Sequence, residues 1–506
     1  MYQVSNLFKV AASQPVQTHR ITGTIGSIAF NESNIKAGSM VFSNQCTDTS
    51  DVVLGSAYIG QLTATFVGIN LSYSAWTKKK ITLSFGLLLS NNTWEDIPMG
   101  IYTIKEAKHT AEGVQITAYD NMYKFDKVIK NKKTILGFVT DSMWSFIDIA
   151  CTKCHVTLGM TKAQIDALPN GYRAANDIEI YGDAKDKQFA NDITTYRDLI
   201  YWCAQTMGCF ATINRSGQLV FKQYTQTIAD EIDDEHRLSG AQFEDYTTHY
   251  SGIYVTDMDT NEDVYYGYDA SEIAEQISEC QSDITDTQTA IEQNIVAIAG
   301  IDEQLAELKQ KYENHEITEE QYITQKTALD NQKKELKEER KQLNNNLKQL
   351  QKKLQWLLDE LAAATDEEGA VISLGANPFV QYENPTKRGN TRMRILQALG
   401  NVSYTPFSCS TIMGAMYDLG DVLHFSGGWI EDAYCCLMAY DYTYNGEYVM
   451  HGYGSDPEEV MVKSKAQKMA TAAGQSATKA EGGGGYIVAA VNTGSVVEYT
   501  LNGQDA

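Results

Sequence analysis

Two kinds of hydrophobic pattern share this chain. Residues 1–268 and 370–456 carry short runs of alternating or β-branched apolar residues, separated by Gly, Asn and Asp, which is typical of β-strands. Between them, from about Asp269 to Gly369, apolar residues recur instead at steps of three, four or seven. That spacing keeps one apolar stripe on a single side of a helix and indicates a coiled coil.

The central segment divides into two arms. The apolar stripe of the first arm comprises Ile273, Ile277, Ile284, Ile291, Ile295, Ile298, Leu305, Leu308 and Tyr312, and that of the second comprises Leu329, Leu336, Leu343, Leu347, Leu350, Leu354, Leu357 and Leu361. Between the arms, Thr318-Glu319-Glu320-Gln321 has the form of a capping box that begins a new helix. We therefore predict an antiparallel helical hairpin whose arms each reach about 60–65 Å.

The β-patterned segments predict a series of short strands. We expect strands at Thr24–Phe30, Gln61–Val67, Lys80–Leu87, Gly100–Ile104, Val114–Tyr119, Gly252–Asp257, Val264–Tyr268, Ala370–Leu374, Val422–Phe425, Tyr434–Tyr444 and Tyr448–Tyr453. Asn445-Gly446 is a strong hairpin-turn signal between the last two. Val139–Ala150 and the segment that begins at Thr195 have helical patterns, and Asn214-Arg215-Ser216-Gly217 indicates a turn between two further strands.

These patterns predict an α+β fold that is mostly β, divided into five parts. An all-β domain would cover 1–130 and a small α+β domain 131–240. A second β domain would combine 241–268 with 370–456, and the antiparallel coiled coil would be inserted at 269–369. Residues 457–506 would form a connector, in which Lys463–Lys479 is helical, Gly482–Gly485 is a flexible joint and Tyr486–Tyr499 is a short β-like piece.

The balance of charge limits the classes of function. The net charge is -24, from 65 acidic and 41 basic residues, which argues against a protein that coats nucleic acid with Lys and Arg stripes. The acidic composition remains compatible with a channel wall along which DNA slides without binding. No signal peptide or membrane-spanning run is evident, so we expect synthesis in a cytosol, where nine cysteines would stay reduced.

Cysteine and histidine spacing suggests sites that other features disfavour. Cys151-Thr152-Lys153-Cys154-His155 has the spacing of a c-type haem attachment site, but packing at the end of an apolar helix is the more common use of such cysteines. Zinc would need further ligands, and no second CxxC or HxxxH is present. Cys203 and Cys209 flank a helix-to-strand turn, where we expect them to be buried.

Other candidate sites are also better explained structurally. Asp257-Met258-Asp259-Thr260-Asn261 begins like a calcium loop, but Glu262 and Tyr268 occupy positions that require Gly and Glu. A polar hairpin tip explains it better. The eight histidines are scattered, without HExxH, and no Gly-x-Ser-x-Gly or phosphate-binding loop occurs. We therefore predict no enzyme, with no catalytic, cofactor-binding or metal-binding residue.

Tyrosines are concentrated near the C-terminal hairpin. Alternation would place Tyr440, Tyr442 and Tyr444 on one face of a strand. Such a face could bind carbohydrate, although cross-strand packing or a subunit interface is the more common role.

Three groups of short motifs occur in order along the chain. They are Ile97–Ile104 with Ile116–Asp120; Tyr196–Ile200 with Gly208–Ile213 and Gly217–Leu219; and Asn377-Pro378-Phe379 with Tyr404–Phe407 and Asp418–Asp421. Together they resemble phage tail hub proteins, a family that includes prophage tail proteins of Gram-positive hosts often labelled tail endopeptidase. The similarity spans roughly residues 20–455 apart from the predicted hairpin.

The resemblance implies a fold and a role. The two β domains would be similar β-barrels, and three copies of the chain would form a ring of pseudo-sixfold symmetry. That ring would join the hexameric tail tube to distal tip proteins in a phage or phage-like particle. Expected partners are the chain itself as a homotrimer, the tail tube and distal tail proteins, the tape-measure protein and distal tip or fibre proteins. DNA would pass without specific binding, and no stable membrane insertion is expected.

The resemblance also leaves alternatives open. The protein would belong to the virion, at the tail tip or baseplate, after synthesis in the host bacterial cytoplasm. In this family a hydrolase is usually an appended domain, and we expect none here. A peptidoglycan hydrolase that depends on Cys203 or Cys209, or a receptor- or glycan-binding tail protein, are the competing hypotheses. The inserted hairpin is not general to the family; we expect a strut that contacts neighbouring baseplate proteins, or a decoration without a partner.

Overall fold

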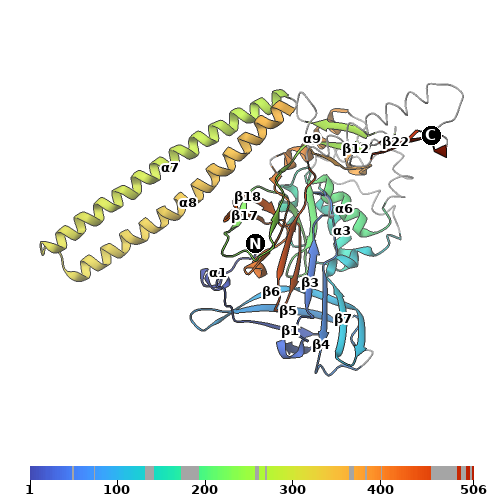
Figure 1. Cartoon of the computed structure of the whole chain (residues 1–506), viewed down its shortest axis with the longest axis horizontal. Coiled ribbons are helices and arrows are strands. Elements are labelled where there is room, and N and C mark those ends of the chain that lie inside the picture. Colours follow the sequence, from blue (N-terminus) through green and yellow to red (C-terminus); the bar gives the residue numbers. More distant parts are fainter. Residues whose placement is uncertain are drawn as a thin grey trace.

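The computed structural model describes residues 1–47, 51–72, 75–130, 142–172, 193–256, 261, 263–267, 270–363, 370–381, 385–400, 402–456, 487–491, 497–501 and 504–505. The fold is mixed α+β and mostly β, with a long pair of antiparallel helices that projects from the body (Figure 1). Among the described residues, none of the helices combines the length and the apolar character needed to cross a membrane.

The body is built on one sheet of eleven strands. In spatial order they are β11 (Gln242–Phe243), β16 (Phe407–Thr411), β20 (Tyr448–Gly452), β19 (Ala439–Thr443), β3 (Val41–Gln45), β4 (Gln61–Phe66), β7 (Gly113–Tyr119), β6 (Trp94–Thr110), β5 (Lys80–Leu88), β1 (His19–Ile25) and β2 (Ile28–Asn31). Neighbouring strands in this order are antiparallel. Alternation of buried and partly buried residues along β16 and the first half of β5 shows why the period-2 pattern forms strands here.

The centre of this sheet joins the two ends of the sequence. β19 pairs with β3, so that Asp441 lies opposite Ser43 and Tyr442 opposite Phe42. We predicted two separate β-barrel-like domains, but the described strands form one open sheet that runs from β11 to β2, and no closed barrel is found among them. The predicted domain boundaries remain predictions, although the strands assigned to the two β domains share this sheet.

Several strand predictions are corrected by local turns. The predicted strand Thr24–Phe30 is a hairpin, because Gly26 with φ +63° turns β1 into β2. The predicted strand Tyr434–Tyr444 is divided between β18 (Ile430–Cys436) and β19. The hairpin turn at Asn445-Gly446 is confirmed: Asn445 has φ 61°, and the Gly446 amide donates to the Thr443 carbonyl at 2.8 Å.

Smaller sheets surround the large one. β10 (Ile228–Ile232), β17 (Val422–Gly427) and β18 form one of them, and β8 (Cys209–Ile213) pairs with β9 (Leu219–Gln223) in another. A third contains β13 (Asp263–Gly267), β12 (Thr248–Thr256) and β14 (Ala370–Ser373), with β15 (Ser403–Tyr404) paired to β12. A fourth contains β21 (Ile487–Val491), β22 (Val497–Leu501) and β23 (Gln504–Asp505), where the sequence predicts a short β piece.

The remaining helices are short, and several have clear caps. They are α1 (Asn6–Ala12), η1 (Glu32–Asn34), η3 (Asn121–Asp126), α3 (Trp144–Cys154), α4 (Lys162–Asp166), α6 (Tyr196–Thr206), η5 (Pro378–Val380), α9 (Pro385–Leu399) and η6 (Gly414–Met416). Thr195 and Asp198 form a capping box at the start of α6, and Gly208 follows the end of the helix with φ +63°. The helix predicted from Thr195 is therefore confirmed.

The inserted hairpin consists of α7 (Ala270–Glu313) and α8 (Glu319–Ala363). With 44 and 45 residues, the helices are each about 66 Å long at 1.5 Å per residue. The predicted capping box is present, because the Gln321 amide donates to Thr318 Oγ1 and the Thr318 amide to Gln321 Oε1. The prediction of an antiparallel hairpin is confirmed.

The seam of the hairpin differs from the predicted stripe at one point. Ile295 is 47% exposed, whereas Asn294 is 5% exposed and lies in the seam. Asn294 continues the alternating steps of three and four through Thr287, Ile291 and Ile298. Its Nδ2 donates to the Leu336 carbonyl at 3.0 Å and to Glu339 Oε2 at 3.1 Å. The phase of the heptad, and not the hydrophobicity of Ile295, therefore decides which residue is buried.

The tyrosines of the C-terminal hairpin belong to the core. Tyr442, Tyr444 and Tyr448 are buried, and Tyr442 stacks on Phe42 with ring centroids 5.8 Å apart. Tyr440 is partly buried and stacks on Tyr448 at 5.3 Å. This confirms cross-strand packing as the role of these residues, in place of an exposed carbohydrate platform.

Candidate functional site

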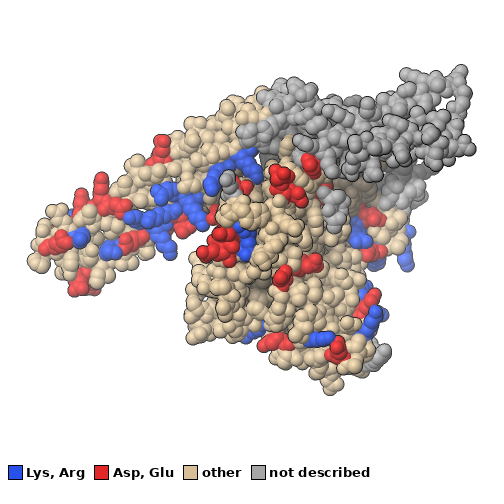
Figure 2. All heavy atoms as spheres, in the orientation of Figure 1, with Lys and Arg blue, Asp and Glu red and all other residues tan. Residues whose placement is uncertain are grey.

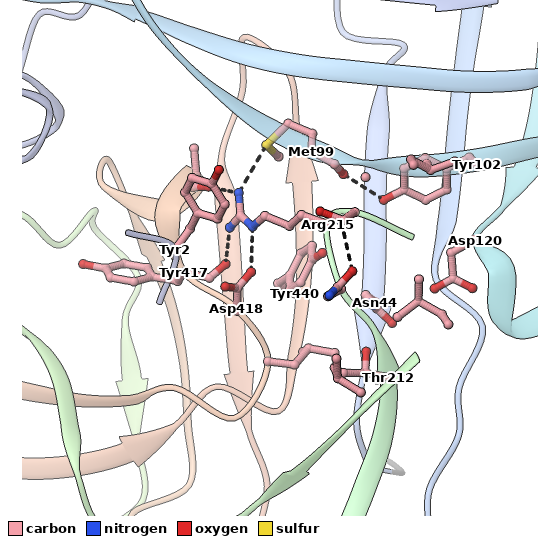
Figure 3. Close-up of a pocket in the computed structure, with 18 of the residues that line it drawn as sticks. Tyr2, Asn44, Met99, Tyr102, Asp120, Thr212, Arg215, Tyr417, Asp418 and Tyr440 are labelled. Atoms are coloured by element: carbon pink, nitrogen blue, oxygen red, sulfur yellow. Dashed lines mark hydrogen bonds and ion pairs between the residues drawn. The ribbon is translucent and has the colours of Figure 1, made fainter. Parts of the chain in front are cut away.

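The sequence predicted no catalytic or ligand-binding residues, so the candidate site comes from the structure. A cavity of about 220 Å³ lies where three parts of the chain meet (Figure 3). Its walls come from residues 99–102 of β6, from the turn between β8 and β9, and from the segment 415–419 that precedes β17. The three motif groups that carry the family resemblance all contribute residues to it, including Ile101, Ile213 and Asp418.

Arg215 is the centre of this junction. Its Nε donates to Asp418 Oδ1 at 2.7 Å, and its Nη2 donates to the Tyr417 carbonyl at 2.9 Å. Its Nη1 donates to the carbonyls of Ala415 at 2.9 Å and Pro98 at 3.2 Å. One side chain of the middle segment thus bonds to both the N-terminal and the C-terminal segments, and Figure 3 shows it extending between them.

The turn that presents Arg215 is fixed by its own residues. Asn214 Oδ1 accepts from the amides of Ser216 and Gln218, both at 3.0 Å. Gly217 has φ +76°, a conformation that L side chains rarely adopt, and its carbonyl accepts from Asn121 Nδ2 at 2.6 Å. The sequence predicted this turn but gave no sign of the role of Arg215, because its partners are remote along the chain.

The charges of Arg215 and Asp418 support each other inside the junction. Their side chains are 14% and 30% exposed. Burial opposes ionisation of Asp418, but the positive charges of Arg215 and Lys222 and the hydrogen bond from Arg215 outweigh it and lower the pKa of the carboxyl. Lys222 also donates from Nζ to the Leu419 carbonyl at 2.7 Å. The ion pair is therefore a partly buried structural contact.

A second carboxyl at the cavity, that of Asp120, has a raised pKa in place of a lowered one. Asp120 is 5% exposed. Its oxygens accept from the amides of Met122 at 2.9 Å and Gly60 at 3.0 Å. Burial raises the pKa of Asp120 to about 7, although both hydrogen bonds act to lower it. Asp120 is the last residue of the first motif group, and it joins the end of β7 to the segment before β4.

The base of the helical hairpin is fastened to the body. Gln349 Nε2 donates to the Gln226 carbonyl at 2.8 Å, and Asn345 Nδ2 to Glu231 Oε1 at 3.3 Å. Lys352 Nζ lies 4.0 Å from the centroid of the Tyr434 ring, and burial lowers the pKa of this lysine to about 8. These contacts lie on the face of α8 opposite its seam, so α8 lies between α7 and the body (Figure 1).

The hairpin surface is divided by charge. α7 contains no Lys or Arg before Lys309, whereas α8 is rich in Lys from Lys333 to Lys353. Figure 2 shows basic side chains along α8 on the face toward the viewer, whereas the basal half of α7 presents mainly uncharged residues to the same view. In a chain with a net charge of -24, this basic stripe is a distinct surface.

The cysteines behave as the packing hypothesis predicts. All nine are buried thiols that form no disulfide. Cys151 and Cys154 lie in the last turn of α3, where burial raises their pKa values to about 12 and about 11, and His155 ends the helix with φ 55°. Cys203 and Cys209 are also buried, and burial raises the pKa of Cys209. Both are core residues, as predicted.

Two other candidates can be placed only in part. Residues 257–260 and 262, which would begin a calcium loop, lie outside the described residues, as do Lys463–Lys479 and Gly482–Gly485 of the predicted connector. Within the described ranges, no group of three or more His, Cys, Asp or Glu side chains is arranged to hold a metal ion.

Comparison with known proteins shows a distant likeness to a solved structure. No protein-family model matches the chain, and no curated protein matches it. A solved structure, the 43 kDa tail protein of prophage MuSo2 from Shewanella oneidensis, is similar over 86% of this chain and 98% of its own, with a TM-score of 0.41 and 9% sequence identity. A likeness at that level does not by itself assign a function.

Proposed function

We propose that the chain is a structural hub of a phage or phage-like tail tip or baseplate. Three copies would form a ring that joins the hexameric tail tube to distal tip proteins. The observation that supports this most directly is the junction at Arg215. The three motif groups that resemble tail hub proteins are far apart in sequence, yet residues of all three line one cavity. Arg215, which lies within the second group's segment, donates hydrogen bonds there to Pro98 of the first group and to Asp418 of the third.

The junction suits a component that must keep its shape under load. Arg215 holds carbonyls from residues 98, 415 and 417 in one network. Such a network has one low-energy arrangement, because moving any segment leaves a buried polar group without its partner. A ring that connects a tube to a tip needs the same fixed relation between its parts.

The hairpin supports an assembly role as well. A rod about 66 Å long has a geometry suited to reaching other proteins, and its base is held by the contacts of Gln349 and Lys352. We propose that it acts as a strut against neighbouring baseplate proteins. The other proposed partners are the tail tube and distal tail proteins, the tape-measure protein and distal tip or fibre proteins.

The acidic composition is compatible with a channel wall. A wall of like charge would let DNA pass without specific binding. We propose that the protein resides in the virion, at the tail tip or baseplate, after synthesis in the host bacterial cytoplasm, and that it does not insert stably into a membrane.

Mass photometry of the purified full chain tests the ring. We expect a trimer, and we expect electron microscopy of particles to place the protein at the tail tip. A monomer at every concentration and salt condition, together with absence from the tail tip, would overturn the proposal. Deletion of residues 270–365 with a short linker tests the strut separately: particles that assemble and infect normally would exclude that role.

We propose a structural role without catalysis, and a cell-wall digest tests it. Purified protein incubated with host cell walls should release no soluble muropeptides. Release that is lost when Cys203 or Cys209 is changed to Ala would favour the hydrolase alternative. The receptor-binding alternative loses its main support from the burial of Tyr442 and Tyr444, and isolated protein should not block adsorption.

A further inference from the structure

The two flanks of the helical hairpin carry opposite charge. On α8, Lys334, Lys337, Lys341 and Lys348 are exposed and spaced by three, four and seven residues, so they form one stripe. We call this stripe the basic flank. On α7, Glu279, Asp283 and Asp286 are exposed and spaced by four and three residues. Together with Glu335 of α8 they form what we call the acidic flank.

Seam contacts show that these flanks lie on opposite sides of the rod. Asn294 of α7 bonds to Glu339 of α8, and Thr287 approaches Asn346, seven residues further along α8. These two contacts mark one side of the seam. Asp283 and Asp286 are four residues and one residue before Thr287, and Glu335 is one turn from Glu339, so the acidic flank lies on this side. At about 100° per residue, the lysines of the basic flank are rotated roughly 140–180° from Glu339 around α8.

The two flanks also lie at the same height along the rod. Thr287 meets Asn346, and Cys280 Sγ lies 3.3 Å from the Leu350 carbonyl. Lys348 is therefore level with Asp283 and Asp286, and Lys334 is next to Glu335 along α8. When copies are related by rotation about an axis parallel to the rods, neighbouring rods have no shift along that axis. The lysines of one rod and the carboxylates of the next would then lie at the same height and face each other.

We propose that the hairpins of neighbouring copies pack side by side, with the basic flank of one copy against the acidic flank of the next. The occupant of each flank is a second copy of this chain. The contact joins two different surfaces, and repetition of such a head-to-tail contact closes a ring when the rotation allows. The inference rests on the ring of the proposed function, for which it supplies a contact surface.

Charge-reversal variants of the full chain test the contact. K334E/K337E/K348E reverses the basic flank, and E279K/D283K/D286K reverses the acidic flank. Lys341 stays unchanged because its Nζ is 3.9 Å from Glu231 in the body. Each variant should weaken self-association by at least about tenfold, and the combination of both sets should restore it, since the flanks are again complementary. The matched control E303K/E307K changes two exposed charges on α7 that are about 25 Å or more along the helix from Asp286, and it should have little effect.

Cysteine crosslinking tests the geometry directly. Asp283→Cys with Lys348→Cys puts one thiol on each flank at the same height, too far apart around one rod to pair within a chain. Mild oxidation should give covalent multimers on a non-reducing gel, and the same-flank pair Lys334→Cys with Lys348→Cys should give none. Circular dichroism checks that every variant keeps its helices.

The outcomes separate the contact from the proposed function. A wild-type trimer that is insensitive to both charge reversals, without crosslinked multimers, would overturn the side-by-side contact and leave the ring standing. A wild-type chain that stays monomeric in every condition and forms no crosslink would overturn both.

Discussion

Removal of the Arg215 guanidinium should loosen the junction of the whole body. Arg215→Met keeps much of the aliphatic volume but removes every hydrogen bond that the guanidinium makes. It leaves Asp418 without its nearest cation and the carbonyls of Pro98, Ala415 and Tyr417 without this donor. We expect the free energy of unfolding to fall as a consequence.

The magnitude follows from burial. Breaking one partner of a buried ion pair costs about 3–5 kcal/mol, because the remaining charge and carbonyls stay desolvated. Asp418, the charge that Arg215→Met leaves behind, is 30% exposed, so solvent screening places the expected loss toward the lower end of this range. Arg197 is a matched control, since it pairs with Asp126 at 2.7 Å but with the two side chains 37% and 44% exposed. Arg197→Met should therefore cost no more than about 1 kcal/mol.

Urea unfolding and hydrogen exchange measure the two effects. Arg215→Met should lower the unfolding free energy by about 3–5 kcal/mol and speed amide exchange in residues 98–102 and 415–419. Arg215→Lys should fall between wild type and Arg215→Met, because an ammonium keeps the charge but cannot reproduce the planar set of donors. A loss for Arg215→Met that equals the loss for Arg197→Met would refute the central role of this residue.

Three further changes test other parts of the structure. Asn294→Leu should stabilise the hairpin by about 1–3 kcal/mol, because an apolar seam residue replaces a buried amide whose Oδ1 has no hydrogen-bond partner. The measurement is amide exchange in α7, which should become slower; unchanged exchange would contradict the prediction. Asp120→Asn should flatten the pH dependence of stability. In the wild type the pKa of Asp120 is raised from 3.8 to about 7, so the unfolding free energy falls by up to about 4 kcal/mol as the pH rises from about 4 to about 7. If urea titrations gave the same dependence of unfolding free energy on pH for both proteins, this role of Asp120 would be excluded. Gly217→Ala should lower the unfolding free energy by about 1–2 kcal/mol in the same urea titration, because φ is +76° and a Cβ would lie 3.0 Å from Asn121 Nδ2. The control Gly240→Ala has φ +96° and open space around the new Cβ, so it should lose only the energy of the backbone strain.

Local patterns in the sequence predicted the local elements well. The heptad spacing located both arms of the hairpin, and Thr195 and Asn445 marked a helix start and a strand turn that the structure contains. The sequence pattern places Ile295 in the seam because it is apolar and lies four residues after Ile291 and three before Ile298. The heptad register that continues through Thr287 selects Asn294 instead. The heptad phase could have revealed this, since it was present in the sequence.

Non-local features could not be read from the same patterns. The pairing of β3 with β19 joins residues about 400 apart, and alternation specifies which face of a strand is buried but not which strand lies beside it. Arg215 was visible only as a turn residue, because all of its partners are remote in sequence. A buried arginine is identified by what surrounds it, and only the fold supplies that.

The junction and the hairpin base together explain how a mostly β body could hold a long rod in a fixed direction. β17 begins directly after the segment that Arg215 holds, and β10 and β18 flank β17 in one sheet. That sheet carries Glu231 and Tyr434, which contact α8 through Asn345 and Lys352. A displacement at the junction would therefore be transmitted through β17 to the base of the rod, so Arg215→Met should disturb the contacts between neighbouring hairpins as well as stability. Weaker crosslinking of the Asp283→Cys and Lys348→Cys pair in the Arg215→Met background would demonstrate that mechanical connection, and unchanged crosslinking would show that the rod is positioned independently of the junction.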